Sequence, residues 1–577
     1  MRNTRGTRHS LRSTRKLSII AQDPSVKING KIVRASIDVP AEELLPGPRG
    51  YRVVVVDYDV TANALYTPAD LPSGLDGDYV DPFDKAPDAK LLSDPRFHAQ
   101  NAYAIAMRIL ARFEYALGRR VQWGCEGHQL NILPHAFAEP NAFYSREDRS
   151  LFFGYFESRP DADGATRTIF SSLSHDVVAH ETTHAILDGL RARYLEPSSP
   201  DQGAFHEGFS DVVALLSVFA LPDVVATVLD GNPTDHLIDQ KLLTKKRLAE
   251  SVLFRLADEM GQEMSGVRGQ ALRHSVKLKP GEDYMNGPQY QEVHDRGELL
   301  VAAMLRSFLD IWLSRLSRIG TIAEGRKDRS LVVEEGARAA DHLLTMAIRA
   351  IDYCPPVDLS FSDYLSALLT VDREVVPDDK YGYRSALLAN FSDYGIEPSS
   401  RADEDGSWLR CDSEMIYSRT HFDSMLRDSE EVFRFVWENR KALDIGDIGY
   451  VEVQSVRPSV RVAPDGFVLR ETIAEYVQVL TLKVEELQLD FNVPVPAEME
   501  PWRAVRILGG GTLIFNEYGQ LKYQIANHLL KDDDDIARQG RRLAYLWEQG
   551  FFDKQQDRGT NFAAVHLSIN GVKETVR

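Results

Sequence analysis

The stretch His175-Asp-Val-Val-Ala-His180-Glu181-Thr-Thr-His184-Ala-Ile-Leu-Asp188 is the most informative part of this 577-residue sequence. On a helix, His180 and His184 stand four residues apart on one face, so two imidazoles can reach one Zn²⁺ while Glu181 lies beside them as a base. An ordinary amphipathic helix with two surface histidines can carry the same short pattern. Further residues are needed to decide between these interpretations.

A second segment, Phe205-His-Glu207-Gly-Phe-Ser-Asp211, supplies the acids that a zinc site requires. A catalytic zinc takes three protein ligands, and Glu207 is the candidate for the third. A ligating imidazole usually donates its other N–H to a carboxylate or a carbonyl, and Asp188 and Asp211 are the candidate acceptors. With these acids present, the zinc interpretation is favoured over the plain helix.

Taken together, these segments resemble the thermolysin-like metallopeptidases, which are gluzincins with a glutamate as third zinc ligand. Asn141-Ala-Phe-Tyr144 is similar to the edge strand on which that family binds its peptide substrate. Val293-His294, just ahead of a long apolar helix, is similar to the segment with the family's transition-state-stabilising histidine. The resemblance covers about residues 96–397 and leaves both flanks unexplained.

The resemblance implies a Zn²⁺ cofactor, a peptide or protein substrate, and a role for each matching residue. These are the zinc ligands His180, His184 and Glu207, the base Glu181, the oxyanion donors His294 and Tyr194, and the substrate-binding residues Asn141 and Ala142. Zinc lowers the pKa of bound water toward about 7, so a carboxylate can accept its proton near neutral pH. The carboxylate partner of His294 stays open between Asp283, Glu292 and Asp295, and the arginine for the substrate carbonyl between Arg268 and Arg273.

Periodicity predicts further elements along the chain. Strands are expected at 16–20, 51–58, 144–155, 450–462 and 512–524, and helices at 101–117, 174–191, 211–221, 298–316 and 335–351. The acidic, Gly- and Pro-rich residues 71–95 indicate a loop. Gly509-Gly510-Gly511 is interpreted as a bulge or strand start, and the acids at 532–535 as the start of a helix.

These elements, together with the resemblance, predict an α+β protein. The expected fold is a thermolysin-like two-lobed metallopeptidase, with a β-rich N-terminal lobe and a helical C-terminal lobe, followed by an additional C-terminal α+β domain that contains β-strands. The expected units are a basic disordered tail (1–16), a β-rich segment with an acidic loop (17–95), the metallopeptidase core (96–397), a polar linker (398–413) and the C-terminal domain (414–577).

Composition excludes several classes of protein. Lys and Arg total 67 against 86 Asp and Glu, a net charge of −19, which disfavours a nucleic-acid binder. The apolar stretch at 212–221 is too short to span a membrane, and no apolar segment of signal-peptide length follows the basic N-terminus. Three unclustered cysteines suit a reducing compartment, so the cytoplasm is the expected location.

The sequence therefore predicts a zinc-dependent endopeptidase that works inside the cell. One alternative is a zinc aminopeptidase, but the Gly-x-Met-Glu-Asn element that captures a free amine is missing. A second alternative is a catalytically retired metallopeptidase fold that acts as a binding or scaffold protein. The intact ligands and the intact base Glu181 argue against it.

Overall fold

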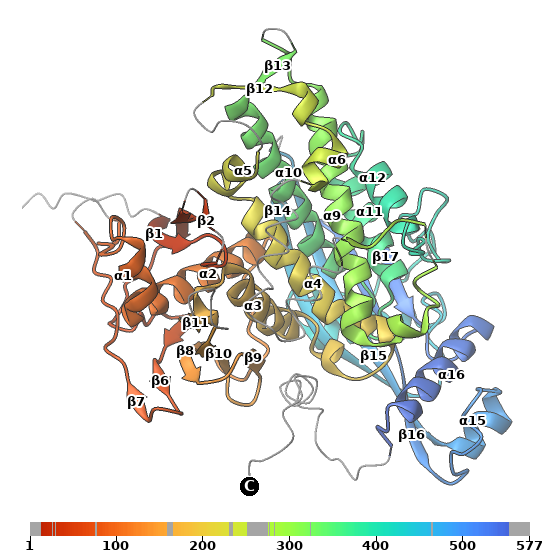
Figure 1. Ribbon diagram of the computed structural model, residues 1–577. Coiled ribbons are helices and arrows are strands. Elements are labelled where there is room, and N and C mark those ends of the chain that lie inside the picture. Colours follow the sequence, from red (N-terminus) through yellow and green to blue (C-terminus); the bar gives the residue numbers. More distant parts are fainter. Residues whose placement is uncertain are drawn as a thin grey trace, which may run out of the picture.

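The computed structural model describes residues 13–552, apart from 26, 29, 75–77, 159–165, 230–234, 251–274, 276, 282, 323–324 and 463–465. Helices make up 42% and strands 22%, which confirms the α+β class. Figure 1 shows the N-terminal strands and α2 on one side, long helices on the other, and a C-terminal sheet behind the helices. Most of the predicted basic tail lies outside the described residues.

Strands of the N-terminal part pack against α2 (Pro95–Leu117), a helix that is buried along most of its length. One sheet has the order β11-β10-β8-β5, and β9 and β11 pair with successive segments of β10. The strands are β1 (Thr14–Ile20), β2 (Lys27–Ile28), β3 (Lys31–Ile32), β4 (Arg34–Pro40), β5 (Val53–Val55), β6 (Tyr58–Asp59), β7 (Ala64–Leu65), β8 (Leu130–Phe137), β9 (Ala142–Ser145), β10 (Ser150–Glu157) and β11 (Thr168–Phe170).

Three expectations change in this part. Strand β1 begins at Thr14 rather than at residue 16, because Thr14 pairs with Pro40 of β4. Residues 144–155 form the hairpin of β9 and β10 rather than one strand, and Arg149 in their connection has a positive φ of 55°. The predicted loop at 71–95 contains the short helix α1 (Asp88–Ser93), because Leu91 is buried in an apolar cluster with residues of α2.

The middle of the chain is a group of helices around α3 (His175–Leu190). This helix is buried on nearly every side, as a core helix is, and it packs against α2, α4 and β9. The other elements are α4 (Pro200–Phe219), α5 (Pro222–Val228), α6 (Lys245–Glu250), α9 (Val293–Ser317), α10 (Arg329–Ala350), α11 (Phe361–Val375) and α12 (Tyr383–Ser392), with the paired strands β12 (Leu237–Asp239) and β13 (Arg326–Asp328).

Helix α4 begins earlier than the sequence pattern predicts. The expected helix at 211–221 is the second half of α4, whose first residue is Pro200. The side chain of Ser199 accepts a hydrogen bond from the backbone N–H of Gln202, and proline suits the first helical position. This earlier start places Glu207 in the middle of a helix rather than in a connecting segment.

The C-terminal part is an antiparallel sheet in the order β14-β15-β16-β17, accompanied by four helices. Its elements are β14 (Tyr450–Val462), β15 (Val468–Lys483), β16 (Ala504–Asn516), β17 (Leu521–Asn527), α13 (Phe422–Met425), α14 (Ser429–Glu438), α15 (Val484–Phe491) and α16 (Asp533–Glu548). The strand predicted at 450–462 is confirmed, whereas 512–524 is a hairpin. Asp532 caps α16 by accepting a hydrogen bond from the backbone N–H of Asp535, as predicted from the acids at 532–535.

The glycine triplet at 509–511 lies within β16, so its interpretation as a bulge or strand start is wrong. These glycines pair in regular register with residues 476–478 of β15. A Cβ on Gly510 would lie 2.6 Å from the carbonyl oxygen of Tyr476, and one on Gly509 would lie 2.7 Å from the backbone nitrogen of Leu529. The triplet therefore lets neighbouring chain segments approach the sheet closely.

Buried ion pairs attach the C-terminal sheet to the helices. Arg119, which follows α2, pairs with Asp352 at 2.6 Å. Arg461 of β14 pairs with the same carboxylate and, at 2.7 Å, with Glu471 of β15. The stretch expected to be a polar linker is packed around Trp408, which is only 4% exposed.

No single helix in the described part of the chain combines the length and the apolarity that a membrane crossing requires. Only α4 and α5 taken together meet these criteria, and the two are bent by 84° relative to each other.

Candidate metal centre

Helix α3 carries His180, Glu181 and His184 in the core of the molecule. The spacing of the two histidines places them one turn apart, and their ring centroids are 4.4 Å apart. His180 is 4% exposed, and Glu181 and His184 are fully buried. Such polar side chains are buried at a high cost in desolvation unless they have partners, so their presence in a core helix indicates a polar site.

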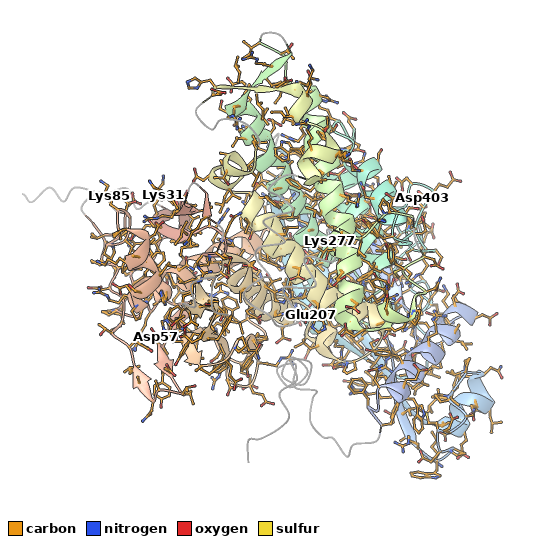
Figure 2. The ribbon with its side chains drawn as sticks, in the orientation of Figure 1. Lys31, Asp57, Lys85, Glu207, Lys277 and Asp403 are labelled. Carbon is orange, nitrogen blue, oxygen red and sulfur yellow. The ribbon has the colours of Figure 1, made fainter. Side chains whose placement is uncertain are left out.

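Glu207 of α4 faces this pair. Its Oε2 lies 3.5 Å from Nε2 of His180, and its Oε1 lies 3.7 Å from Nε2 of His184. One potential ligand atom from each of the three residues falls within 4.8 Å of the others. In Figure 2 Glu207 lies near the middle of the molecule, where α4 passes beside α9.

This donor set fits Zn²⁺. Zinc is commonly bound by imidazole nitrogen and carboxylate oxygen at about 2.0–2.2 Å, and tetrahedral coordination at that length separates ligand atoms by about 3.4 Å. The contacts of 3.5 and 3.7 Å from Glu207 to the two imidazoles are close to this separation. In the described residues this is the one group of three or more His, Cys, Asp or Glu side chains close enough to share an ion.

The outer nitrogens of both imidazoles are hydrogen-bonded. Nδ1 of His180 lies 2.7 Å from Oδ1 of Asp211, one turn after Glu207 on α4. Nδ1 of His184 lies 2.7 Å from Nδ1 of His206. If His184 offers Nε2 to a metal, its Nδ1–H donates and His206 accepts, which fixes the tautomers of both rings. His206 looks like a local structural histidine in the sequence, so this contact was not predicted.

Asp188, predicted as an acceptor for a ligating imidazole, is engaged with Tyr144 and Arg146. Its Oδ2 accepts a hydrogen bond from the hydroxyl of Tyr144 at 2.9 Å and from Nε of Arg146 at 2.7 Å. The guanidinium of Arg146 neutralises the carboxylate, which explains why Asp188 turns toward the β9 hairpin instead of the imidazole. Asp188 therefore ties α3 to β9.

His294 is brought to the same site by α9. Its Nε2 lies 3.8 Å from Oε2 of Glu207, and its Nδ1 lies 3.0 Å from Oε1 of Glu292. Of the three acids left open by the sequence, Glu292 is the one in contact, and it also caps α9 through the backbone N–H groups of His294 and Asp295. Burial raises the pKa of Glu292, but its hydrogen bonds with His294 and these N–H groups outweigh that effect and lower it.

The hydroxyl of Tyr194, predicted as an oxyanion donor, is engaged with the backbone in this structure. Tyr194 belongs to the 3₁₀ turn η2 (Ala192–Leu195), beyond the end of α3. Its hydroxyl donates to the backbone carbonyl of Pro355 at 2.7 Å, and its ring is buried against Phe205. Six residues of helix advance the chain by about 9 Å, so the end of α3 is well separated from His184.

Asn141 and Ala142 lie at the start of β9, which packs against α3. Asn141 is 7% exposed, and its Oδ1 accepts a hydrogen bond from the backbone N–H of Ala142 at 2.8 Å. Within the described residues β9 pairs with β10 alone, so no second strand occupies its other edge. An extended peptide can add to such an edge through backbone hydrogen bonds.

The surroundings of the triad are rich in carboxyl groups. Glu298 lies one turn after His294 on α9, and burial together with Asp295 and Asp211 raises its pKa to about 9. Burial and nearby Asp23 raise the pKa of Asp176, in the first turn of α3, to about 7. The two candidate arginines, Arg268 and Arg273, lie outside the described residues.

Comparisons with known proteins assign the chain to no family, because a scan against models of protein families finds no match and a search of curated proteins finds none.

Proposed function

We propose that this chain is a zinc-dependent metallopeptidase of the thermolysin-like kind that hydrolyses internal peptide bonds. The supporting observation is the convergence of His180, His184 and Glu207, from two packed helices, with His294 from a third. In this proposal the N-terminal strands and α2 form the β-rich lobe, and α4 to α12 form the helical lobe. The centre lies where α3 joins them.

The residues His180, His184 and Glu207 would hold the zinc ion. When bound, zinc supplies a Lewis acid that polarises a carbonyl group and makes water more acidic. The hydrogen bond that Nδ1–H of His180 donates to Asp211 orients that ring so that Nε2 faces the site. The contact between His206 and Nδ1 of His184 does the same for the second ring.

Proton transfer is assigned to Glu181. A carboxylate next to both histidine ligands can take the proton of the attacking water and deliver it to the leaving amine. Nε2 of His294 then donates a hydrogen bond to the oxygen that becomes negative as the peptide carbonyl is attacked. Glu292 holds Nδ1 of His294, so the ring presents Nε2 to the site. The edge of β9 opposite β10 would hold the substrate in an extended conformation.

The test compares the wild type with Glu181→Gln on a library of peptides blocked at their N-termini. The amide keeps the size of the side chain but cannot accept the proton, so hydrolysis is expected to fall by about 10²–10⁴-fold, while the zinc content from elemental analysis stays unchanged. The exposed Glu126→Gln is the matched control and keeps full activity. Glu181→Gln cleaving at the wild-type rate would overturn the assignment.

Two further measurements separate the alternatives. A His180→Ala/His184→Ala double variant is expected to lose the zinc that the wild type retains after dialysis, and equal zinc in both proteins would contradict the metal site. Cleavage of blocked peptides distinguishes an endopeptidase from an aminopeptidase, which needs a free amine. A wild type that binds zinc and cleaves no peptide of the library would support the retired scaffold instead.

A further inference from the structure

A cavity of about 730 Å³ lies among α9, α10, α11 and the segment that leads into α12. This volume is within the usual range for small-molecule sites, about 300–1,000 Å³. Neither the two histidines of α3 nor Glu207 lines it. The cavity is therefore separate from the metal centre, and the proposed peptidase activity leaves it without a role.

Arg349 of α10 lines this cavity and is 5% exposed. Its Nε donates to the backbone carbonyl of Ala116 at 2.8 Å, and one Nη donates to that of Val462 at 3.4 Å. Among the described residues no carboxylate forms an ion pair with it. Burial and the neighbouring cation Arg461 lower the pKa of Arg349 to about 10, so the guanidinium is still charged at neutral pH. A buried charge of this kind is costly unless an anion accompanies it.

The acidic side chains around the cavity are already engaged. Asp341 pairs with Arg112, and Asp372 accepts from Arg384 at 2.6 Å. Asp379 accepts the backbone N–H of Tyr383. The remaining acid, Asp378, is exposed at the rim, where water screens it. None of these carboxylates therefore neutralises Arg349.

The other basic groups of the lining are neutral, paired or exposed. Arg315 pairs with Glu335 at 2.7 Å and covers the ring of Tyr381 at 4.5 Å. Burial and the charge of Arg315 lower the pKa of His342 to about 4, so this imidazole is uncharged at neutral pH. Lys380 is exposed at the rim. Arg349 is thus the one buried cation of the lining that has no carboxylate partner among the described residues.

The rest of the lining is mainly apolar. Met346, Val371 and Val375 contribute aliphatic surface, and Tyr115 and Tyr381 contribute aromatic rings. Ligand sites commonly combine such surface with a few polar groups that fix the orientation of the ligand. A single guanidinium next to apolar walls matches an organic molecule with one anionic end, and a planar carboxylate fits its fork of N–H donors.

We propose that this cavity binds a small monocarboxylate with an apolar body, and that the carboxylate pairs with Arg349. Inorganic phosphate fits less well, because it has no apolar part and carries more charge than the single guanidinium balances. The proposal does not depend on the peptidase function.

The test is calorimetric titration of the full chain, treated with chelator to remove metal, with 3-phenylpropionate as the probe. We expect binding in the wild type and at least about tenfold weaker binding of the neutral amide 3-phenylpropionamide and of phosphate. Arg349→Gln is expected to weaken the binding of 3-phenylpropionate by at least about tenfold. Arg338→Gln, an exposed arginine on the same helix, is the matched control and leaves the affinity unchanged.

A second variant covers the case in which Arg349→Gln does not fold. Thr345→Trp keeps Arg349 and places a large side chain at a lining position, so it is expected to reduce binding as well. No binding in the wild type up to about 10 mM would overturn the proposal, because the dissociation constants of weak small ligands are near 1 mM. Unchanged binding in both cavity variants, equal binding of the amide or of phosphate, or loss of binding in His180→Ala/His184→Ala would also overturn it.

Discussion

At the scale of single residues, the candidate metal centre depends on the groups behind its ligands as much as on the ligands themselves. Asp211 and His206 engage the outer nitrogens of the two histidines of α3. Glu292 holds His294 both through its ring and through its backbone N–H. These contacts leave one nitrogen of each of the three rings facing Glu207.

The prediction at this scale concerns His294. If its Nε2 donates to the oxyanion, His294→Ala lowers kcat and kcat/KM together by about 10²–10³-fold, because the donor acts mainly in the transition state. Zinc content and Tm should stay near the wild-type values. Kinetics, elemental analysis and thermal unfolding on one preparation provide the check.

Glu292→Gln is the companion variant for His294. It keeps a hydrogen-bond acceptor but loses the charge that favours a proton on Nδ1. The loss of kcat and kcat/KM is therefore expected to be smaller than in His294→Ala, with an altered pH profile. A purely structural histidine would give the opposite pattern, in which His294→Ala lowers Tm and the folded fraction turns over at the normal rate.

At the scale of elements, the close approach of α4 and α9 brings His294 to Glu207. Gly208 follows the glutamate on α4, and Gly297 lies on α9 near His294. A Cβ on Gly208 would lie 2.7 Å from the carbonyl oxygen of Gly297, and one on Gly297 would lie 3.1 Å from that of Ala204. Both glycines are therefore needed because backbone meets backbone at this crossing.

Gly208→Ala is the prediction at this scale. The added methyl group has only backbone to displace, so α9 must shift, which should cost about 1–3 kcal/mol of stability. The shift moves His294 from Glu207, and peptide hydrolysis is expected to fall with the zinc content unchanged. Gly320→Ala is the control, because nothing lies within 4 Å of its Cβ. Wild-type stability and activity in Gly208→Ala would contradict this account of the crossing.

At the scale of the whole molecule, the C-terminal sheet is joined to the helical part by polar contacts. Arg191, just after α3, pairs with Glu475 of β15 at 2.9 Å. Glu374 of α11 contacts Lys522 and the hydroxyl of Tyr523 on β17, each at 2.6 Å. The sheet therefore contacts the end of α3, the helix that carries the candidate ligands His180 and His184.

Glu374 gives a prediction for the pH dependence of stability. Burial raises the pKa of Glu374, but Lys522, Tyr523 and Arg410 outweigh burial and lower it from 4.5 to about 2. The folded state therefore binds this proton more weakly than the unfolded state. Its contribution, about 3.5 kcal/mol at 1.4 kcal/mol per pKa unit, is present above pH 4.5 and lost as the pH falls toward 2.

Denaturant unfolding between pH 7 and pH 2 measures this effect. The difference in free energy of unfolding between the wild type and Glu374→Gln should be largest near pH 7 and shrink below pH 4.5. Glu334→Gln, which removes an exposed pair with Arg338, should change stability by less than about 1 kcal/mol at every pH. A constant difference for Glu374→Gln would contradict the lowered pKa.

The long helices and the placement of His180 and His184 on one helix face were predictable because both follow from local spacing. Helical period places His180 and His184 on one face whatever surrounds them, and Asp211 follows Glu207 by one turn. The elements that the sequence pattern did not predict depend on contacts with other segments of the chain. Residues 144–155 divide into two strands because a turn separates β9 from β10. The glycines at 509–511 lie inside a strand, where β15 and the backbone of Leu529 approach them too closely for a side chain.

The sequence by itself determined which residues can bind a metal and act as a base, because those residues lie within two short helical segments. Only the tertiary structure decided that Glu292 is the partner of His294, that Asp188 turns to Arg146, and that Tyr194 bonds Pro355. The contacts of Asp188 and Tyr194 join positions far apart in the chain, and the contact of Glu292 with His294 depends on where α9 begins. Their geometry depends on how closely helices and strands pack, which no local period in the sequence encodes.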